Sequence, residues 1–449
     1  MSDVFTSGTL TVGQWIELHA KHVAELRNRF DQIFRRFSQV SSIVIHGGKS
    51  NRCNSRDDRY WPTVVTPFFK YWTPYVETPA LLVIRPSEVP TLYIEKHNSF
   101  WEGPAPVNPR WSRDSFSIVE IHDLKASERF ENCIYIGDEE ECAPKGRIVG
   151  DTFDDVLRSM DLLRTQKTEF EVASIKEATW IAGHGHRRLR EKFMSGVPVS
   201  EIDLHYDYLM ATKQTDFSEP YGDIVALGTN AAILHHVHYG RANQSTDTSL
   251  LLDAGASCNG YASDITRTWV RGSSSQASKF RELLYLMETV QQDLCKKFIV
   301  GTEYQSLHNL SHEKIAGVIR DIKLSTASVE ELVTSGATRC LFPHGLGHSL
   351  GLQVHDVGMR FTTPEPRNPG LRNTATVDVG QVVTVEPGLY FIESLLTKLK
   401  GLAVGATFDW ALVDVLQPFG GIRIEDNILA TASGPVNLTR DWLADLVGF

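Results

Sequence analysis

The sequence predicts an α+β protein in two parts, a smaller N-terminal α/β domain over residues 1–160 and a larger α+β domain over residues 161–449. In the first part, one long amphipathic pattern is followed by short apolar runs typical of strands. In the second part, four helical patterns stand among pairs of strand-like runs, which indicates helices grouped with an antiparallel sheet. A chain of 449 residues has room for two or three domains.

The composition excludes several classes of protein. Hydrophobic residues make up 42% of the chain and charged residues 22%, as in an ordinary globular protein. The net charge of −10, without a long basic run, argues against nucleic acid or an anionic membrane as the main partner. We expect no transmembrane span and no secretory signal. The six scattered cysteines form no CxxC pair, which favours reduced thiols in a cytoplasmic protein.

In the N-terminal part, the spacing of apolar residues predicts a helix over residues 11–37. Strands are expected over residues 42–45, 80–84, 91–95, 117–121 and 133–136. The stretch 51–79 between the first two strands is long and aromatic, which indicates a binding or interface role or a loop folded on its own domain. No catalytic constellation is evident in this part.

We expect the boundary between the domains within residues 150–167. Thr168 and Glu171 form a capping box at the start of a helix that Gly196 is placed to end. Ser200, with Asp203 three residues later, opens a second helix. Further helices are expected over residues 276–298 and 304–322.

Residues 250–269 predict a β-hairpin, because two strand-like runs flank Asn259-Gly260, the dipeptide that most favours a two-residue turn. In the resulting register Asp253 faces Thr266 and Asp264 faces Gly255. The two aspartates become diagonal neighbours on one face, with Cα atoms roughly 7–8 Å apart. That separation suits carboxylates that bind a metal pair about 3.5–4 Å apart. A hairpin with solvated aspartates is the alternative.

Three further segments carry imidazole or acidic groups. Residues 342–356 contain three histidines among glycines, and glycine lets the backbone approach a neighbour or a ligand closely. An apolar strand ends in Glu386 and is followed by a Pro-Gly turn, and strand alternation puts Arg423 and Glu425 on one face of a run whose other face is apolar. The three histidines are His344, His348 and His355. The alternatives for the three segments are, in the same order, structural histidines, a solvated strand end and an exposed Arg–Glu pair.

Taken together, these segments supply four carboxylates and one imidazole: Asp253, Asp264, His348, Glu386 and Glu425. Such a donor set suits manganese, iron, cobalt or zinc in a two-metal arrangement. Two metals can hold a hydroxide nucleophile at neutral pH and polarise a carbonyl or phosphoryl oxygen.

The segments LLLDAGASCNGYASDITRTW, FPHGLGHSLGLQVHDVG, VEPGLYFIESLL and LQPFGGIRIEDN resemble those of the pita-bread metallopeptidases, and within that family the bacterial prolidase (Xaa-Pro dipeptidase) group. The resemblance spans the C-terminal part of the chain, and the N-terminal part fits in size and pattern. It implies a pita-bread catalytic domain, an antiparallel sheet flanked by helices, behind a smaller N-terminal α/β domain that serves dimerisation and site closure.

The resemblance also implies roles for individual residues. The five residues of the donor set would be the metal ligands, with Asp264 and Glu425 bridging both ions and Glu386 also acting as general base. Arg372 would bind the terminal carboxylate of the substrate, which a guanidinium can grip with two parallel hydrogen bonds. Other residues would line the substrate site, with His355 assisting at the tetrahedral intermediate: His235, His344, His355, Arg423, Tyr221 and Tyr304. The segment between His355 and Glu386 is shorter than in that group, which puts the side-chain preference of the pocket in doubt.

The function implied is hydrolysis of Xaa-Pro dipeptides by a metal-bridged hydroxide in a cytoplasmic homodimer. Two divalent ions are expected, manganese first, with cobalt, iron or zinc as alternatives. Organophosphorus acid anhydrolase activity on P–F or P–O bonds and aminopeptidase P-type cleavage of longer peptides are the nearest alternatives. An elimination reaction of the sulfonium lyase kind and a non-enzymatic binding protein are the more distant ones.

Overall fold

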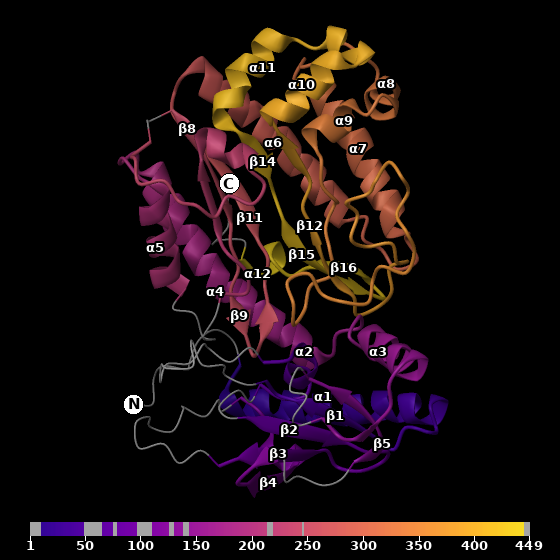
Figure 1. Cartoon of the computed structure of the whole chain (residues 1–449). Coiled ribbons are helices and arrows are strands. Elements are labelled where there is room, and N and C mark those ends of the chain that lie inside the picture. Colours follow the sequence, from indigo (N-terminus) through magenta and orange to yellow (C-terminus); the bar gives the residue numbers. More distant parts are fainter. Residues whose placement is uncertain are drawn as a thin grey trace, which may run out of the picture. The chain divides into compact units, whose positions relative to one another are not determined.

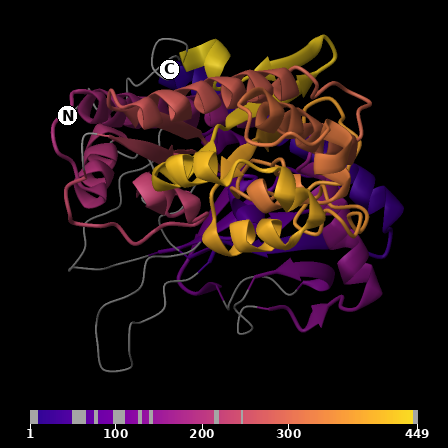
Figure 2. The same ribbon diagram turned by 90° about the horizontal axis from the view of Figure 1, so that it is seen from above.

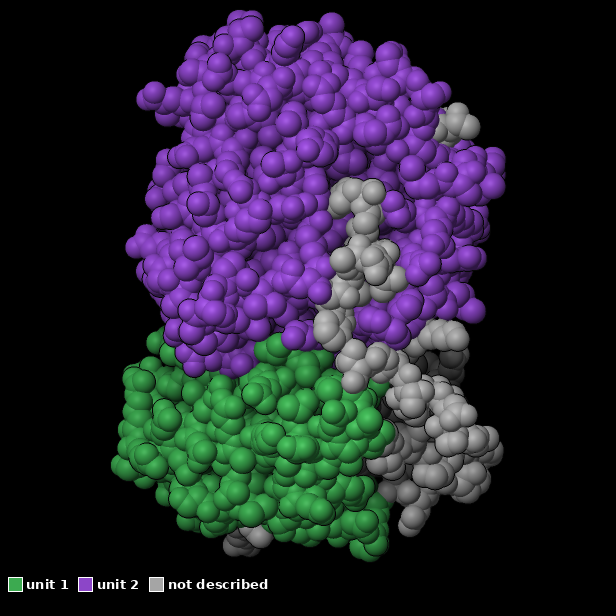
Figure 3. Space-filling view, turned by 180° about the vertical axis from the view of Figure 1, so that it is seen from behind, with its two compact units in different colours: residues 1–164, 168–173 green, residues 165–167, 174–449 purple. Residues whose placement is uncertain are grey.

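The computed structural model describes residues 10–48, 65–74, 79–96, 110–124, 130–137, 143–212, 219–244 and 247–443. The chain divides into two compact units, which Figure 3 colours separately. Unit 1 comprises residues 1–164 and 168–173, and unit 2 comprises residues 165–167 and 174–449. Among the described residues, no helix is both long and apolar enough to cross a membrane.

Unit 1 is built on one six-stranded mixed sheet with the order β4-β3-β2-β1-β5-β6 (Figure 1). The strands are β1 (Ser42–His46), β2 (Ala80–Ile84), β3 (Thr91–Glu95), β4 (Ser117–Ile121), β5 (Glu131–Ile136) and β6 (Gly146–Arg147), and the helices are α1 (Val12–Arg36), α2 (Pro67–Lys70) and α3 (Asp151–Leu163). The predicted helix and the five predicted strands are confirmed. Thr11 caps α1 in a capping box with Gln14, which explains why the amphipathic pattern begins there.

The core of unit 1 takes in part of the aromatic stretch that follows β1. Phe69, Tyr71 and Trp72 are almost completely buried, and Trp72 packs edge-on against Phe30 of α1. These described aromatic side chains therefore fold onto their own unit, as a self-packed loop would. Residues 51–64 and 75–78 of the same stretch lie outside the described residues.

The described residues of unit 2 form four small sheets, β11-β8-β7, β12-β15-β16, β13-β14 and β10-β9, in which all pairs are antiparallel. The strands are β7 (Ile224–Leu227), β8 (Thr248–Asp253), β9 (Ser257–Cys258), β10 (Tyr261–Ala262), β11 (Thr266–Arg271), β12 (Val382–Val385), β13 (Gly388–Tyr390), β14 (Gly421–Arg423), β15 (Asp426–Thr431) and β16 (Gly434–Asn437). The helices are α4 (Glu169–Met194), of which residues 169–173 belong to unit 1, α5 (Glu201–Thr212), α6 (Ser275–Cys295), α7 (Tyr304–Asp321), α8 (Val329–Thr334), α9 (Ala337–Leu341), α10 (Glu393–Gly401), α11 (Trp410–Leu416) and α12 (Arg440–Leu443).

Helices pack on the outer faces of these strands, as Figures 1 and 2 show. Leu204 and Tyr208 of α5 share a core with Val225 of β7 and Leu252 of β8. A larger core joins α6 and α7 to β12, β14 and β15. Isolated bridges pair Thr266 of β11 with Glu425, and Ser349 of the loop before β12 with Val383 of β12. Helices grouped with antiparallel strands confirm the predicted α+β class.

The hairpin has the predicted register. Asp253 pairs with Thr266 across β8 and β11, and the β9–β10 pairing has the same register. Asn259 and Gly260 have φ values of 53° and 84°, as the turn type favoured by Asn-Gly requires. Backbone bonds from Ala254 to Ile265 and from Ser263 to Ala256 carry the register between the two strand pairs. The aspartates are thus placed by a local turn.

The four helices predicted for the C-terminal part of the chain are confirmed, including the capping box in which Thr168 N donates to Glu171 at 2.8 Å. The sequence patterns did not predict α3, which crosses the expected boundary at residue 160. They also did not predict the short helices from α8 to α12. Helices of four to nine residues complete too few turns for a 3.6-residue period to stand out.

Candidate metal centre

The five residues of the donor set come from the ends of strands and from one glycine-rich loop. Asp253 ends β8, Asp264 lies just before β11, and Glu386 directly follows β12. Glu425 directly precedes β15, and His348 lies in the loop between α9 and β12. At the end of a strand, the backbone leaves the regular hydrogen-bonding pattern of the sheet. Four strand ends and the loop that carries His348 can therefore bring polar side chains to one point.

These side chains converge inside unit 2. One ligand atom each from Asp264, His348 and Glu425 lies within 4.8 Å of the others. The Nε2 atom of His348 is 3.4 Å from Asp264 Oδ2 and 3.5 Å from Glu386 Oε1. Asp253 is near enough that its negative charge helps to raise the pKa of Asp264. The structure therefore brings all five predicted residues into one cluster.

The cluster is buried and rich in like charge. Burial, together with the charges of neighbouring carboxylates, raises the pKa of Asp264 and of Glu425. Burial likewise raises the pKa of Glu386, to about 7. For His348, burial acts to lower the pKa, but Asp264 and Glu386 outweigh it and raise the pKa. Carboxylates crowded in a low-dielectric site repel one another, and a bound cation removes that repulsion.

The ring of His348 is oriented as a metal ligand requires. Its Nδ1 atom lies 3.0 Å from the carbonyl oxygen of Ser349, so Nδ1 donates a hydrogen bond to that oxygen. The lone pair of Nε2 then faces the carboxylates. A carbonyl acceptor behind the ring is the arrangement by which proteins set the tautomer of a ligating histidine.

Neighbouring side chains hold the carboxylates in place. Thr266 Oγ1 donates to Glu425 Oε2 at 2.6 Å, and Thr384 Oγ1 donates to Glu386 Oε1 at 3.3 Å. Tyr221 donates its hydroxyl to Asp264 Oδ1 at 2.5 Å. Such partners fix the direction in which a carboxylate presents its free lone pairs.

Arg423 is also part of this framework. Its Nη2 atom donates to Asp253 Oδ2 at 2.7 Å, and its Nη1 atom donates to the hydroxyl of Tyr390 at 3.0 Å. The guanidinium is 4% exposed, so it lies against the carboxylate of Asp253 instead of reaching out from the strand. The charge that Asp253 contributes is therefore already paired on one oxygen.

The other oxygen of Asp253 supplies the test of whether a metal fits. Asp253 Oδ1 is buried and has no hydrogen-bond partner among the described residues. A buried carboxylate oxygen without a partner is costly unless a cation coordinates it. With three more carboxylates and one imidazole nitrogen around it, the donor set suits divalent manganese, iron, cobalt or zinc. The residues present fit a metal centre.

Glycine at position 347 allows the close approach on which this centre depends. A Cβ atom at Gly347 would lie 2.0 Å from the carbonyl oxygen of Thr384 and 2.6 Å from the hydroxyl of Tyr304. The backbone next to His348 thus packs directly on β12, which brings the imidazole to Glu386. Close packing therefore requires glycine at position 347, as expected from the glycines in this segment of the sequence.

Three of the other predicted residues lie around the centre. His344 is 2.8 Å from the hydroxyl of Tyr390 through Nε2, and its Nδ1 is 3.7 Å from Glu386. The ring of His355 packs edge-on against that of His348, with centroids 4.4 Å apart. Burial lowers the pKa of His344 to about 3 and that of His355 to about 4. The charge of His235, whose side chain is exposed, contributes to both shifts and so places it near both rings.

The two remaining predicted residues differ from each other. Arg372 is exposed, and its charge contributes to the lowered pKa of His355, so it lies near that ring. Tyr304 is completely buried, and its hydroxyl donates to the carbonyl of Thr384 at 3.2 Å. Tyr304 therefore supports β12 from within the core of unit 2.

The sequence reading missed Thr384 and Tyr390. Both lie in the segment around Glu386 that the reading singled out, at positions two before and four after the glutamate. Strand alternation puts Thr384 on the same face as Glu386, and that signal was available. Nothing local distinguishes Tyr390, because its partners His344 and Arg423 come from other segments.

Comparison with known proteins assigns the chain to a family. The sequence profile of metallopeptidase family M24 matches residues 173–432, and that of the Xaa-Pro dipeptidase N-terminal domain matches residues 17–154. The chain is 35% identical to a Xaa-Pro dipeptidase of Pseudoalteromonas atlantica, covering 95% of this chain and 99% of the relative. It is 37% identical to a Xaa-Pro dipeptidase of Shewanella sp. strain MR-7, covering 94% and 97%.

Solved structures agree in fold. A variant of Escherichia coli aminopeptidase P in complex with substrate superposes with a TM-score of 0.70 at 21% identity, over 95% of this chain and 98% of that chain. An aminopeptidase P from Pseudomonas aeruginosa also gives 0.70, at 20% identity, over 98% and 97%. The expected pita-bread architecture is thereby confirmed. The chain belongs to metallopeptidase family M24, on the branch that contains the Xaa-Pro dipeptidases.

Proposed function

We propose that this chain is a Xaa-Pro dipeptidase that cleaves the bond between an N-terminal residue and a C-terminal proline. The observation that carries the proposal is the convergence of four carboxylates and one imidazole in unit 2. The chain that holds them is 35% to 37% identical over 94% to 95% of its length to proteins named Xaa-Pro dipeptidase.

In this proposal Asp253, Asp264, His348, Glu386 and Glu425 would hold two divalent ions, with Asp264 and Glu425 as ligands to both. Mn²⁺ is the first choice, since carboxylates dominate the donor set, and Co²⁺, Fe²⁺ and Zn²⁺ are the alternatives. When bound, the ions lower the pKa of a shared water and polarise the scissile carbonyl. The unpartnered oxygen of Asp253 supports this assignment.

The side chains around the centre transfer the proton of the attacking water and stabilise the negative charge that develops. Glu386 accepts the proton of the attacking water as general base, while Thr384 fixes its orientation by a hydrogen bond to Oε1. His355 donates a hydrogen bond to the oxygen that gains negative charge at the tetrahedral intermediate. His235 and His344 line the same side of the site. Their interaction with His355 and Glu386 in this structure supports that arrangement.

Substrate selection rests on the two ends of the dipeptide. Proline has no backbone N–H and a fixed φ, so a peptidase that relies on that N–H handles this bond poorly. Arg372 binds the terminal carboxylate in a bidentate pair and so replaces recognition through the missing N–H. Its exposure and its nearness to His355 support a place at the mouth of the site. Tyr221 and Arg423 act through Asp264 and Asp253, whose carboxylates they hold.

Three further features belong to the proposal. Cytoplasmic location is supported by the described cysteines Cys133, Cys258, Cys295 and Cys340, which are free and buried. The homodimer, with the N-terminal domain closing the site, is testable by light scattering of the full chain. Hydrolysis of organophosphates is proposed as a side activity, because a centre that polarises a carbonyl also polarises a phosphoryl oxygen.

Hydrolysis of Gly-Pro before and after chelation tests the function. Removal of metal should abolish turnover, and Mn²⁺ should restore it. Matched assays with the tripeptide Gly-Pro-Ala and with a fluorophosphate rank the alternatives by kcat/KM. A metal-loaded enzyme that ignores Gly-Pro but cleaves the tripeptide would replace the proposal by aminopeptidase P activity. A higher kcat/KM on the fluorophosphate would make organophosphate hydrolysis the main activity.

A further inference from the structure

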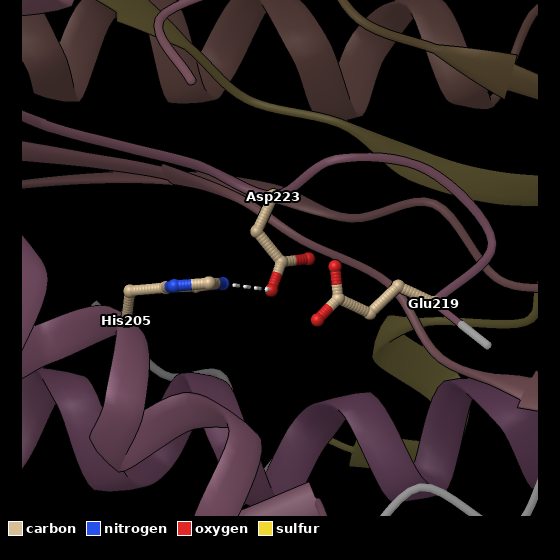
Figure 4. A group of neighbouring side chains, drawn as sticks. All are labelled: His205, Glu219 and Asp223. Atoms are coloured by element: carbon tan, nitrogen blue, oxygen red, sulfur yellow. Dashed lines mark ion pairs between the residues drawn. The ribbon is translucent and has the colours of Figure 1, made fainter. Parts of the chain in front are cut away.

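Unit 2 contains a second group of metal-ligating side chains, formed by His205, Glu219 and Asp223 (Figure 4). One ligand atom of each lies within 4.8 Å of the others. His205 is on α5, Asp223 directly precedes β7, and Glu219 lies four residues earlier on the same segment. In Figure 4 the imidazole and the two carboxylates point toward one another. The Nε2 atom of His205 is 3.3 Å from Asp223 Oδ2.

The carboxylate of Asp223 lies 3.3 Å from His205 but lacks the hydrogen bonds that a structural carboxylate makes. It is completely buried, and neither carboxylate oxygen has a hydrogen-bond partner among the described residues, nor does His205 Nε2. Burial raises the pKa of Asp223 to about 6. Carboxylate oxygens and an imidazole nitrogen that face one another without hydrogen bonds are the donors that a cation requires.

Glu201 is on α5, the helix that carries His205, and it is a buried carboxylate with a full set of hydrogen bonds. Its Oε1 atom accepts from Leu227 N and Asn230 Nδ2, each at 2.8 Å. Its Oε2 atom lies 2.8 Å from His236 Nε2 and accepts from Gly240 N at 2.7 Å. These hydrogen bonds act to lower the pKa of Glu201, and they outweigh the effect of its burial. Both carboxylate oxygens of Glu201 are thus hydrogen-bonded, whereas those of Asp223 are not.

The second group lies on the other face of the sheet from the first centre. Ile224 pairs with Asp253 and packs with Ala226 and Tyr390, on the face of that centre. Val225 and Leu227 point the opposite way, into the core formed with α5. Side chains alternate along a strand, so Asp223, one residue before Ile224, faces α5 with Val225.

We propose that His205, Glu219 and Asp223 bind one divalent transition-metal cation of the zinc class, separate from the metal centre around His348. One imidazole and two carboxylates suit Zn²⁺ or Co²⁺, whereas Ca²⁺ and Mg²⁺ prefer all-oxygen sites. With ligand bonds of 2.0–2.2 Å, tetrahedral geometry separates the ligand atoms by about 3.4 Å. The spacing of His205 and Asp223 already matches this. Glu219, which is exposed, is free to close the remaining distance, and water takes the fourth position.

The ion would also steady a residue of the first centre. Tyr221 lies between Glu219 and Asp223 in the chain, and it donates its hydroxyl to Asp264. A cation that ties both ends of this short segment to α5 restricts the backbone that carries Tyr221. The site is therefore a positioning device for the hydrogen bond to Asp264, and its occupancy is measurable without any assay of activity.

Equilibrium dialysis of the full chain against Zn²⁺ and Co²⁺ tests the proposal. Wild type should hold one metal equivalent more than Glu219→Gln or Asp223→Asn. The control Asp207→Asn also removes one negative charge, from α5, the helix that carries His205; Asp207 pairs there with Lys192, and this variant should bind as much metal as wild type. Because Glu219 is exposed, its variant should fold even if Asp223→Asn does not. Equal metal content in wild type and Glu219→Gln would overturn the proposal.

Hydrogen exchange gives a second readout. Added Zn²⁺ should slow the exchange of the amides of residues 219 and 221–223 at least tenfold in wild type and in Asp207→Asn. In Glu219→Gln the added Zn²⁺ should leave these rates unchanged. The same slowing in Glu219→Gln as in wild type would place the effect at the first centre and refute the second site.

Discussion

Buried histidines in the two units have opposite surroundings. In unit 1, His22 lies 2.6 Å from the carbonyl oxygen of Tyr71 and 2.8 Å from the hydroxyl of Thr168. Burial lowers its pKa to about 4, so the ring is neutral. In unit 2, His348 has a carbonyl on one nitrogen but carboxylates on the other, and its pKa is raised. Burial alone therefore does not distinguish a structural histidine from a ligand.

What distinguishes them is whether the neighbours are satisfied. Both nitrogens of His22 have a neutral partner, and a fully hydrogen-bonded buried network stabilises the fold. Around His348 the carboxylates repel one another, and Asp253 Oδ1 has no partner in the described part of the chain. Such an arrangement costs stability until a cation enters, which is the usual sign of a functional site.

Asp264→Asn should have the largest effect on metal content and turnover. The change keeps the shape of the side chain but removes a charge that would help to hold the proposed ions. Metal content and turnover should fall together, by more than the roughly 10–100-fold that follows loss of an outer-shell partner. Metal analysis and Gly-Pro hydrolysis measure the two effects. Retention of both would refute the ligand assignment.

Thr266→Val should have the next largest effect. It replaces a hydroxyl by a methyl group of similar size and removes the hydrogen bond to Glu425. We expect a loss of about 10–100-fold in metal affinity, as for other groups that orient a ligand. Competition with a chelator measures it. Unchanged affinity would mean that the sheet, and not Thr266, holds Glu425 in place.

Arg372→Ala should separate binding from chemistry. Loss of one charged hydrogen-bonded pair, worth about 1.5–3 kcal/mol, should raise KM for Gly-Pro roughly 10- to 100-fold. Metal content and kcat should stay near wild type, because the arginine acts on ground and transition states alike. Arg360→Ala, which removes another exposed arginine of the same segment, is the control. A KM equal to that of the control would exclude Arg372 from the site.

A change at His22 in unit 1 should have the smallest effect on activity. Because the pKa of His22 falls from 6.5 unfolded to about 4 folded, the unfolded state binds more protons between these values. Stability is therefore complete above pH 6.5 and declines as the pH falls toward 4, by about 3 kcal/mol from this residue.

Urea unfolding at pH 7 and pH 5 tests this expectation. His22→Phe should lose about 1–3 kcal/mol at pH 7, because two buried polar groups lose their partner, and should depend less on pH than wild type. Its metal content should be unchanged. His122→Gln, which changes an exposed histidine of the same unit, is the control. A wild-type stability that does not decline below pH 6.5 would contradict the structural role of His22.

The sequence by itself determined the local features of this protein. Helix α1, the capping box at Thr168, strands β1 to β5 and the register of the hairpin follow from periodicity and turn chemistry, which act over a few residues. It also identified the donor set, because carboxylates and imidazoles among apolar strands and glycines are conspicuous without any knowledge of their neighbours.

Tertiary structure decided which of these groups meet. Thr266 lies opposite Asp253 in the hairpin, yet its hydroxyl binds Glu425, 159 positions away. The guanidinium of Arg423 donates to Asp253, 170 positions away, and the hydroxyl of Tyr304 donates to the carbonyl of Thr384, 80 positions away. The group of His205, Glu219 and Asp223 has no local signature at all. Such contacts depend on how separate strands and helices pack, which no pattern within one segment specifies.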